Sequence, residues 1–435
     1  MDKFVIEGGY PLSGQVSAAG NKNAALPILA ASLLTDEEVV IGNVPRILDV
    51  DAMLALLEDL GVKVSWRDDH EVSLRADGVR GTEVDEELGS RIRASFLLAG
   101  PLLARFGEAL MPPPGGDVIG RRRLDPHLDA LKGLGAQIEV DGNYRMSAPE
   151  GLRACDIFMD EPSVMATENA LMAAALTPGA TRIANAASEP HVQDLARLLV
   201  SMGARIDGIG SNTLTVHGRQ RLGGARHSIR PDHIEIASFM ALAAVTGGHL
   251  RIQDTIPEDL LMIRAVFERL GLTSRFEGND LIVPPEQRLE VKDDVGAAIP
   301  KIDDGPWPAF PADLTSIALA VATQAKGTVM IFEKMFENRL FFVDKLEQMG
   351  ARIILCDPHR AVVNGPSRLH GGRMDSPDIR AGMALLIASL CADGTSEIGS
   401  VGQIDRGYER IDERLSELGA RIERTSGKVR VASGA

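Results

Sequence analysis

Two aspartates stand in this sequence where they could exchange protons with a bound molecule. Asp117 lies in the glycine- and proline-rich stretch of residues 112 to 123, and Asp313 precedes a very apolar segment. An acid between glycines is either a turn residue or a group carried by a mobile lid, with Gly115, Gly116 and Gly120 as hinges. Asp313 is placed to cap a buried helix or to serve as a base, and the two roles are compatible.

Basic residues recur at matching places around these acids, either where an apolar helix is expected to begin or just after an expected strand. Arginine supplies a fixed, always-charged fork for phosphate or carboxylate, and lysine adds a movable point charge. Each residue taken alone is explained by a solvated surface charge, but their shared placement favours one cleft for a small polyanion. These residues are Lys22, Arg93, Arg122, Arg339, Arg380 and Arg406.

A repeat in the sequence would position these residues. A Leu-Gly or Met-Gly pair that ends an amphipathic helix recurs with 68 to 79 residues between successive glycines. Chance recurrence of a common pair would not keep a buried small-residue helix, a strand, the amphipathic helix and a hairpin in the same order. We therefore expect six βαβαββ-like units, with each glycine in a left-handed conformation. The glycines are Gly61, Gly135, Gly203, Gly271, Gly350 and Gly419.

Length and charge narrow the class of protein. A chain of 435 residues exceeds one core, so six units divide naturally into two domains of three. The net charge of −15 argues against a nucleic-acid surface.

The three cysteines lack paired ligand spacing, so no metal site is expected. No apolar run approaches the ~18 residues of a membrane span and no signal core is visible, so a cytoplasmic protein without membrane insertion is expected. Oligomeric state is left open.

Several motifs together resemble the UDP-N-acetylglucosamine enolpyruvyl transferases, the 1-carboxyvinyltransferases that open peptidoglycan synthesis. The resemblance runs essentially from end to end. The matching motifs are Gly20-Asn21-Lys22-Asn23-Ala24-Ala25-Leu26-Pro27, Arg93-Ala94-Ser95, Gly115-Gly116-Asp117-Val118-Ile119-Gly120, Phe310-Pro311-Ala312-Asp313, Phe336-Glu337-Asn338-Arg339, Asp378-Ile379-Arg380-Ala381 and Asp405-Arg406-Gly407-Tyr408-Glu409-Arg410.

This resemblance implies an α/β fold, a two-domain inside-out α/β barrel whose halves close on the substrates. Because the first strand belongs with the later repeats, we place domain I at residues 1–21 and 231–435. Domain II is then residues 22–230 and carries the mobile loop 111–123. No metal ion and no organic cofactor is implied.

The implied reaction moves the enolpyruvyl group of phosphoenolpyruvate to the 3-hydroxyl of UDP-N-acetylglucosamine, with release of phosphate. Such a reaction needs an acid and a base, for which Asp117 and Asp313 are the respective candidates. Lys22 and Arg406 complete the expected catalytic set. The residues implied for phosphoenolpyruvate are Lys22 and Arg122 near the phosphate, Arg339, Arg380 and Arg406 around the carboxylate, and Asn23. Those implied for the nucleotide sugar are Asn23, Arg93, Arg122, Arg123, Leu124, Asp125, Pro126, Ser163, Val164, Asp313, Met335 and Phe336.

The chain departs from the family pattern at Asp117, where a cysteine is common. A free aspartate has a pKa of about 3.9, so we predict that this acid gains its proton only beside the bound, multiply charged substrate. A carboxylate is also a poorer nucleophile than the cysteine that fosfomycin alkylates, so insensitivity to that drug is expected. Arg123, Glu161 and His233 replace a proline, a lysine and an arginine common in the family, which leaves the acceptor less defined than the reaction.

Two alternatives remain open on the sequence. A 3-phosphoshikimate 1-carboxyvinyltransferase would share the fold and much of the anion pocket. A non-catalytic scaffold of the same fold would not need Lys22, Asp117, Asp313 and Arg406 together, which argues against it.

Overall fold

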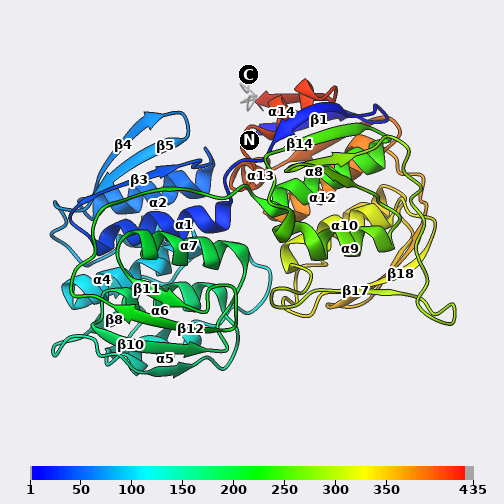
Figure 1. Cartoon of the computed structure of the whole chain (residues 1–435). Coiled ribbons are helices and arrows are strands. Elements are labelled where there is room, and N and C mark those ends of the chain that lie inside the picture. The colour runs from blue at the N-terminus through cyan, green and yellow to red at the C-terminus, as the bar shows by residue number, and fades with distance from the viewer. Residues whose placement is uncertain (1, 427–435) are drawn as a thin grey trace, which may run out of the picture.

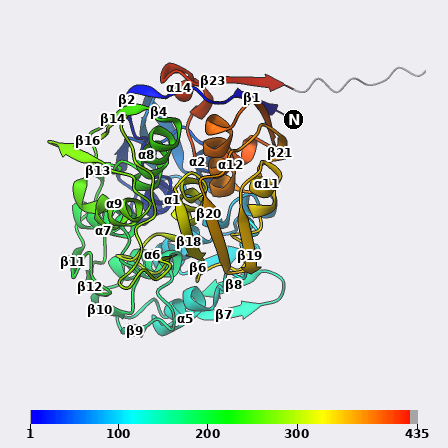
Figure 2. The same ribbon diagram turned by 90° about the vertical axis from the view of Figure 1, so that its right-hand side faces the viewer.

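The computed structural model describes residues 2–426, which form two halves, each with helices enclosed by three β-sheets (Figure 1). The N-terminal half builds its core from residues 24 to 229, and the other half from residues 4 to 16 and 234 to 420. In the view turned by 90°, α1, α2 and α8 lie nearer the middle of the molecule, whereas α5 and α14 lie at its outer edge (Figure 2).

The first half contains seven helices or helix pairs and three sheets. Its sheet orders are β13(Ala225–Ser228)-β3(Glu38–Gly42)-β5(Glu71–Arg75)-β4(Lys63–Asp68), β6(Glu108–Met111)-β8(Tyr144–Ser147)-β7(Gln137–Val140) and β11(Arg205–Asp207)-β12(Thr213–Gly218)-β10(Gly179–Ala184)-β9(Asp156–Phe158). Its helices are α1(Lys22–Ala30) with η1(Ala31–Leu34), α2(Leu48–Asp59), α3(Glu86–Gly89), η2(Arg93–Leu98) with α4(Ala99–Phe106), α5(Asp125–Gly133), α6(Val164–Ala175) and α7(Pro190–Ser201).

The second half repeats this plan. Its sheet orders are β15(Arg275–Glu277)-β16(Asp280–Val283)-β14(His249–Gln253)-β2(Ser13–Ser17), β17(Lys301–Asp303)-β18(Gly327–Phe332)-β20(Arg360–Gly365)-β19(Ile353–Asp357) and β21(Arg373–Asp375)-β22(Thr395–Gly399)-β1(Asp2–Glu7)-β23(Arg421–Ser426). Its helices are α8(His233–Thr246), η3(Pro257–Leu260) with α9(Leu261–Arg269), η4(Ala312–Leu314) with α10(Thr315–Ala322), α11(Val343–Gln348), α12(Ile379–Cys391), α13(Gly402–Asp405) and α14(Ile411–Glu417).

Small apolar residues explain why one helix of each unit lies inside. Helices α8, α10 and α12 contact one another, and most of their residues are buried. A helix that is apolar on all sides is stable only when other elements surround it. The predicted α/β class with helices inside and sheets outside is therefore confirmed. Within residues 2–426 the sheets remain six separate open sheets and do not close into a barrel.

All six repeat glycines adopt the predicted left-handed backbone, with φ between 82° at Gly271 and 112° at Gly203. Each follows the helix or turn that leads into the next strand, where a Cβ atom would add strain. At Gly271 a Cβ would also come within 2.3 Å of the Arg288 carbonyl oxygen. The glycines therefore end the amphipathic helices as the sequence predicted.

The chain crosses between the halves twice, at adjacent places. Asn21 N donates to Arg230 O at 2.8 Å, and Asp232 N donates to Ala19 O at 2.9 Å. The first strand, β1, lies between β22 and β23, so the N-terminus completes the last sheet. These contacts and the two separate cores support the division at residues 21 and 231, which stays a proposal.

We predict that Gly271→Ala lowers the stability of the second half by about 2 kcal/mol or more, because it adds both left-handed strain and a clash. Gly203→Ala, where no atom lies within 4 Å of the added Cβ, isolates the strain and should cost about 1 kcal/mol. The measurement is the urea midpoint of each variant. Gly81→Ala is the control, since it has open space and no positive φ. Equal midpoints for all three variants would contradict the prediction.

Candidate functional site

The buried helices present charged residues at their N-terminal ends, as the sequence predicted. Lys22 is the first residue of α1, Arg93 the first of η2 and Arg380 the second of α12. Asp313 lies in η4, directly before α10. The backbone N–H groups at these ends add a positive potential to that of the basic side chains, which favours binding of an anion.

A chain of alternating charges joins the two halves. Lys22 Nζ lies 2.9 Å from Asp49 Oδ2, and Arg406 Nε lies 2.8 Å from Asp49 Oδ1. Arg406 Nη1 also pairs with the Asp117 carboxylate and donates to Gln403 Oε1 at 3.0 Å. Arg406 from the second half thus holds Asp49 and Asp117 from the first half at the same time.

Asp49 is the buried centre of this series of ion pairs, and its side chain is only 5% exposed. Burial opposes ionisation of its carboxyl, but the Lys22 ammonium and the Arg406 guanidinium outweigh burial and lower the pKa of Asp49. Burial likewise disfavours the Arg406 charge, and the hydrogen bond to Asp49 nevertheless raises the pKa of Arg406. Asp49 and Arg406 are therefore held charged at neutral pH.

Asp313 sits between two arginines of the second half. Its Oδ1 lies 2.9 Å from Arg339 Nη2, its Oδ2 lies 3.0 Å from Arg380 Nη2, and Asn23 Nδ2 donates to Oδ2 at 3.4 Å. Burial would raise the pKa of Asp313, but Arg380 and then Arg339 outweigh it and hold that pKa far below its ordinary value. The capping alternative is wrong, because the carboxylate binds no backbone N–H of η4 or α10.

The loop between β6 and α5 is folded around its own arginine. Arg122 Nη2 donates to the Asp117 carbonyl oxygen at 2.6 Å, and Arg93 Nη2 donates to the Arg122 carbonyl oxygen at 2.7 Å. Burial and the neighbouring Arg122 charge lower the pKa of Arg93 to about 10. A Cβ at Gly115 would meet the Ser90 carbonyl oxygen at 1.6 Å, so the chain passes there only as glycine. These contacts place Arg93, Arg122 and Asp117 together.

The same loop crosses to the second half. Asn338 N donates to Ile119 O at 3.0 Å, and Arg121 N donates to Glu337 Oε2 at 3.1 Å. Gly120, with φ of 135°, lies where a Cβ would come within 2.2 Å of that Glu337 oxygen. The loop therefore lies across the cleft in the position expected of a lid, and its mobility stays a prediction.

Residues predicted for the nucleotide lie around a second ion cluster. Arg123 Nη1 is 2.8 Å from Asp160 Oδ2 and 3.7 Å from Glu161 Oε2, and Arg123 Nε is 3.4 Å from Asp125 Oδ2. Thus two departures from the family pattern, Arg123 and Glu161, compensate each other's charge. This cluster links the start of α5 to the segment before α6, where Ser163 and Val164 lie.

His233, the third departure, is buried and does not act as a cation. Its Nδ1 lies 3.1 Å from Asn21 Nδ2, and its ring faces Trp307 and stacks on His191. Burial, reinforced by the Arg380 charge, lowers the pKa of His233 to about 3. It therefore helps to hold Asn21, whose side chain caps α1 at the Ala24 amide.

Met335 and Phe336 lie on a segment that is tied to buried acids. Met335 N donates to Asp304 Oδ2 at 3.3 Å, and Phe336 N donates to Glu333 Oε1 at 3.2 Å. The Phe336 ring lies 5.3 Å from the Arg339 guanidinium carbon. These contacts bring Met335 and Phe336 close to Arg339, which pairs with Asp313. Leu124 and Pro126 lie in the segment that begins α5.

Four contributors were missed by the sequence analysis. Asp49 and Gln403 bind Arg406, Asp232 accepts from Lys22 N at 3.3 Å, and Tyr408 Oη accepts from Arg380 Nη1 at 3.3 Å. Asp49 stands in the first turn of α2, where an acid is ordinarily explained by the helix dipole. Tyr408 lies in the quoted Asp-Arg-Gly-Tyr-Glu-Arg motif, which was the available signal.

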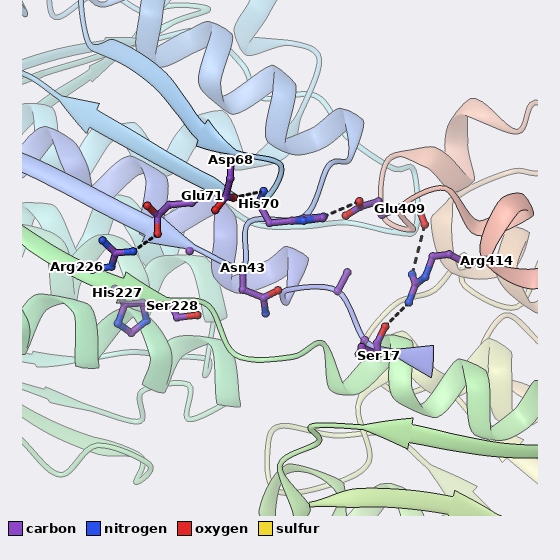
Figure 3. A pocket seen from close by; sticks show the side chains of 13 residues that line it. Ser17, Asn43, Asp68, His70, Glu71, Arg226, His227, Ser228, Glu409 and Arg414 are labelled. Carbon is purple, nitrogen blue, oxygen red and sulfur yellow. Dashed lines mark hydrogen bonds and ion pairs between the residues drawn. The ribbon is translucent and has the colours of Figure 1, made fainter. Parts of the chain in front are cut away.

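A hollow of about 820 Å³ lies at the chain crossings and contains none of the predicted site residues (Figure 3). Polar groups that line it are paired within the protein: His70 Nε2 lies 2.9 Å from Glu409 Oε1, and Arg414 Nη2 donates to Ser17 O at 2.7 Å. We therefore place the chemistry at the smaller cavity of about 500 Å³ beside Asp117, Arg339 and Arg406.

Within residues 2–426, no helix combines the length and apolar character required to cross a bilayer. In the same residues, no three His, Cys, Asp or Glu side chains gather as metal ligands.

Comparison with known proteins identifies close relatives over nearly the whole chain. A protein-family profile described as EPSP synthase (3-phosphoshikimate 1-carboxyvinyltransferase) matches residues 6–415. UDP-N-acetylglucosamine 1-carboxyvinyltransferases from Bradyrhizobium diazoefficiens and Treponema denticola are 56% and 54% identical, each over 97% of this chain and 98% or 99% of the relative. Among solved structures, the enolpyruvyl transferase NikO from Streptomyces tendae is 25% identical with a TM-score of 0.87, covering 98% of this chain and 99% of that one. EPSP synthase from Acinetobacter baumannii shares the fold at 18% identity, with a TM-score of 0.76 and coverage of 98% and 100%.

We predict that Asp49→Asn lowers the free energy of unfolding by about 2 kcal/mol at pH 7, because it leaves the buried Lys22 ammonium without a carboxylate and removes one of the two carboxylates that pair with Arg406. Since folding lowers the Asp49 pKa, this contribution is present above about pH 4 and is lost as the pH falls through the lowered value. The difference in urea midpoint from wild type should therefore hold from pH 7 to about pH 5 and narrow near about pH 3.

The matched control is Asp36→Asn, which removes an exposed carboxylate 3.4 Å from Arg221. It should change stability by less than about 0.5 kcal/mol. A loss for Asp49→Asn no larger than for this control would show that the buried ion chain adds no stability.

Proposed function

Because the chain belongs to the 1-carboxyvinyltransferase family, we propose that it transfers the enolpyruvyl group of phosphoenolpyruvate to the 3-hydroxyl of UDP-N-acetylglucosamine and releases phosphate. The observation that carries the proposal is the meeting of Lys22, Asp117, Asp313 and Arg406 across one cleft. A scaffold without chemistry needs no acid and base on opposite sides of a cationic pocket. Relatives of about half-identical sequence carry the nucleotide-sugar name, so the shikimate alternative is not favoured.

The reaction begins with addition across the double bond of phosphoenolpyruvate. Asp313 accepts the proton of the sugar 3-hydroxyl as its oxygen bonds to C2 of the donor, and Asp117 gives a proton to the methylene carbon C3. Elimination then returns a proton from C3 to Asp117 and breaks the bond between C2 and the phosphate oxygen, and the proton taken up by Asp313 leaves with the phosphate. The products are the enolpyruvyl ether and inorganic phosphate.

The ion pairs around these aspartates suggest how substrate binding prepares them. The donor carboxylate and phosphate compete with Asp117 and Asp313 for Arg406, Arg339 and Arg380. When Arg406 binds the donor, Asp117 loses its cation and faces a new anion, and both changes favour its protonated form. Asp313 is ionised before the donor binds, because its arginines hold its pKa low, and the loss of these arginines to the donor raises that pKa and makes the carboxylate a stronger base.

Lys22 and Arg122 bind the donor phosphate and stabilise its departure in this proposal. The nucleotide lies along Arg93, the residues 122 to 126, Ser163 and Val164, with Met335 and Phe336 beside it. Arg123 is held by three carboxylates, so its charge is largely neutralised and it contributes shape more than net attraction. The product feeds peptidoglycan synthesis, which places the enzyme in the cytoplasm.

Phosphate release from purified protein tests the assignment. With phosphoenolpyruvate present, we expect release with UDP-N-acetylglucosamine and none with shikimate 3-phosphate. Lys22→Ala and Asp313→Ala should each lower kcat by about 100-fold or more, because they remove a preorganised charge or the base. Release with shikimate 3-phosphate alone would favour the sister reaction. Release with neither acceptor would favour a non-catalytic protein.

Fosfomycin gives a separate test of Asp117. We expect no time-dependent inactivation of the wild-type enzyme, because a carboxylate is a poor nucleophile toward the epoxide. Asp117→Cys should keep activity and become sensitive, with a covalent adduct visible by mass spectrometry. Cys356, exposed on β19, is the internal control, since an adduct there would not depend on the substitution. Inactivation of the wild type through Asp117 would contradict the prediction.

A further inference from the structure

The cavity beside Asp117 contains a charged residue besides those that the resemblance assigns to the donor. We call Asp117, Arg339 and Arg406 its inner wall, because their side chains are only 18%, 3% and 17% exposed. Lys345 on α11, 24% exposed, is the most exposed cation that lines the cavity. The cavity volume, about 500 Å³, lies in the range of small-molecule sites. Lys345 therefore shares this space with the reacting groups, yet it has no role in the proposed reaction so far.

The charges of the inner wall are already committed to partners within the protein. Arg406 pairs with Asp49 and Asp117, and Arg339 pairs with Asp313. The carboxylate of Asp378, which also lines the cavity, accepts from Arg380 N and Ala381 N and so caps α12. An anion entering the cavity must displace these contacts before it reaches an inner arginine.

Lys345 differs from the other cations of the cavity. Within residues 2–426, its Nζ has one carboxylate partner, the neighbouring Asp344 at 3.5 Å, whose side chain is 57% exposed. Such an exposed pair is weak, so the ammonium exchanges it for a stronger anion at little cost. The Lys345 side chain itself is only 24% exposed, because it lies against the cavity wall. Its flexible stem lets the charge follow a ligand that moves inward.

We propose that Lys345 is a donor-binding residue at the entrance of the site, which attracts phosphoenolpyruvate and holds its phosphate before the inner ion pairs open. This inference rests on the proposed function and adds a residue to its donor site. A phosphate carries about −1.5 to −2 charges at neutral pH, and the donor adds a carboxylate. A cation in a partly enclosed cavity raises the local concentration of such an anion. Since Lys345 acts before the chemical step, it changes KM for the donor and leaves kcat nearly unchanged.

Steady-state phosphate release at saturating UDP-N-acetylglucosamine tests this role with Lys345→Gln and Lys345→Arg. We expect Lys345→Gln to raise KM for phosphoenolpyruvate by about threefold to tenfold, with kcat within about twofold of wild type. Lys345→Arg should restore most of the loss. The gap between Lys345→Gln and wild type should shrink between about 20 mM and about 300 mM salt, because screening weakens the attraction. KM for the nucleotide sugar should not change.

The control is Lys326→Gln. Lys326 is exposed, directly precedes β18 and lies outside the cavity. It should behave like wild type. A KM for phosphoenolpyruvate in Lys345→Gln equal to that of this control would overturn the proposal. An equal rise in KM for both substrates, independent of salt, would overturn it too, because that pattern indicates a structural role. If the wild type releases no phosphate, the proposed function fails, and calorimetric binding of phosphoenolpyruvate to the same proteins, with UDP-N-acetylglucosamine present, still decides the role of Lys345.

Discussion

The site depends on ion pairing. It gathers several like-charged side chains, and when no substrate is bound their charges must be neutralised by other residues of the protein. Arg406 meets this need by binding Asp49 on one side and Asp117 on the other. Asp313 does the same for Arg339 and Arg380. Each of these buried charges has an opposite neighbour. The same pairing makes the site responsive, because an anionic ligand would compete directly with the aspartates for which we propose proton transfer.

The repeat supplies the geometry for this arrangement. The helices that are buried on nearly all sides lie inside their halves. Lys22, Arg93 and Arg380 stand at the N-terminal ends of such helices. The second unit adds the loop between β6 and α5, which reaches Asn338 and Glu337 of the other half. A repeated fold thus produces one site between two halves.

Substitutions relative to the family change the chemistry more than the fold. Asp117 lies beside Arg406, so a carboxylate occupies the position where the resemblance leads us to expect a thiol. Arg123 and Glu161 exchange charges within one ion cluster, and the segment they link is preserved. His233 loses the charge of an arginine and packs as a neutral ring. The ion pair of Arg123 with Glu161 and the neutral packing of His233 explain how the fold tolerates these changes.

The sequence by itself determined the units, the glycine turns, the buried helices and most of the charged residues of the site. These features depend on local periodicity and on backbone conformations that only glycine adopts without strain. The tertiary structure alone decided which charges pair. Asp49 resembles any acid in a first helical turn until Arg406, 357 residues away in sequence, contacts it. The capping role considered for Asp313 failed because its carboxylate binds two arginines, Arg339 of the same repeat and Arg380 of the next one. Such pairings depend on distances across the cleft, which no local pattern encodes.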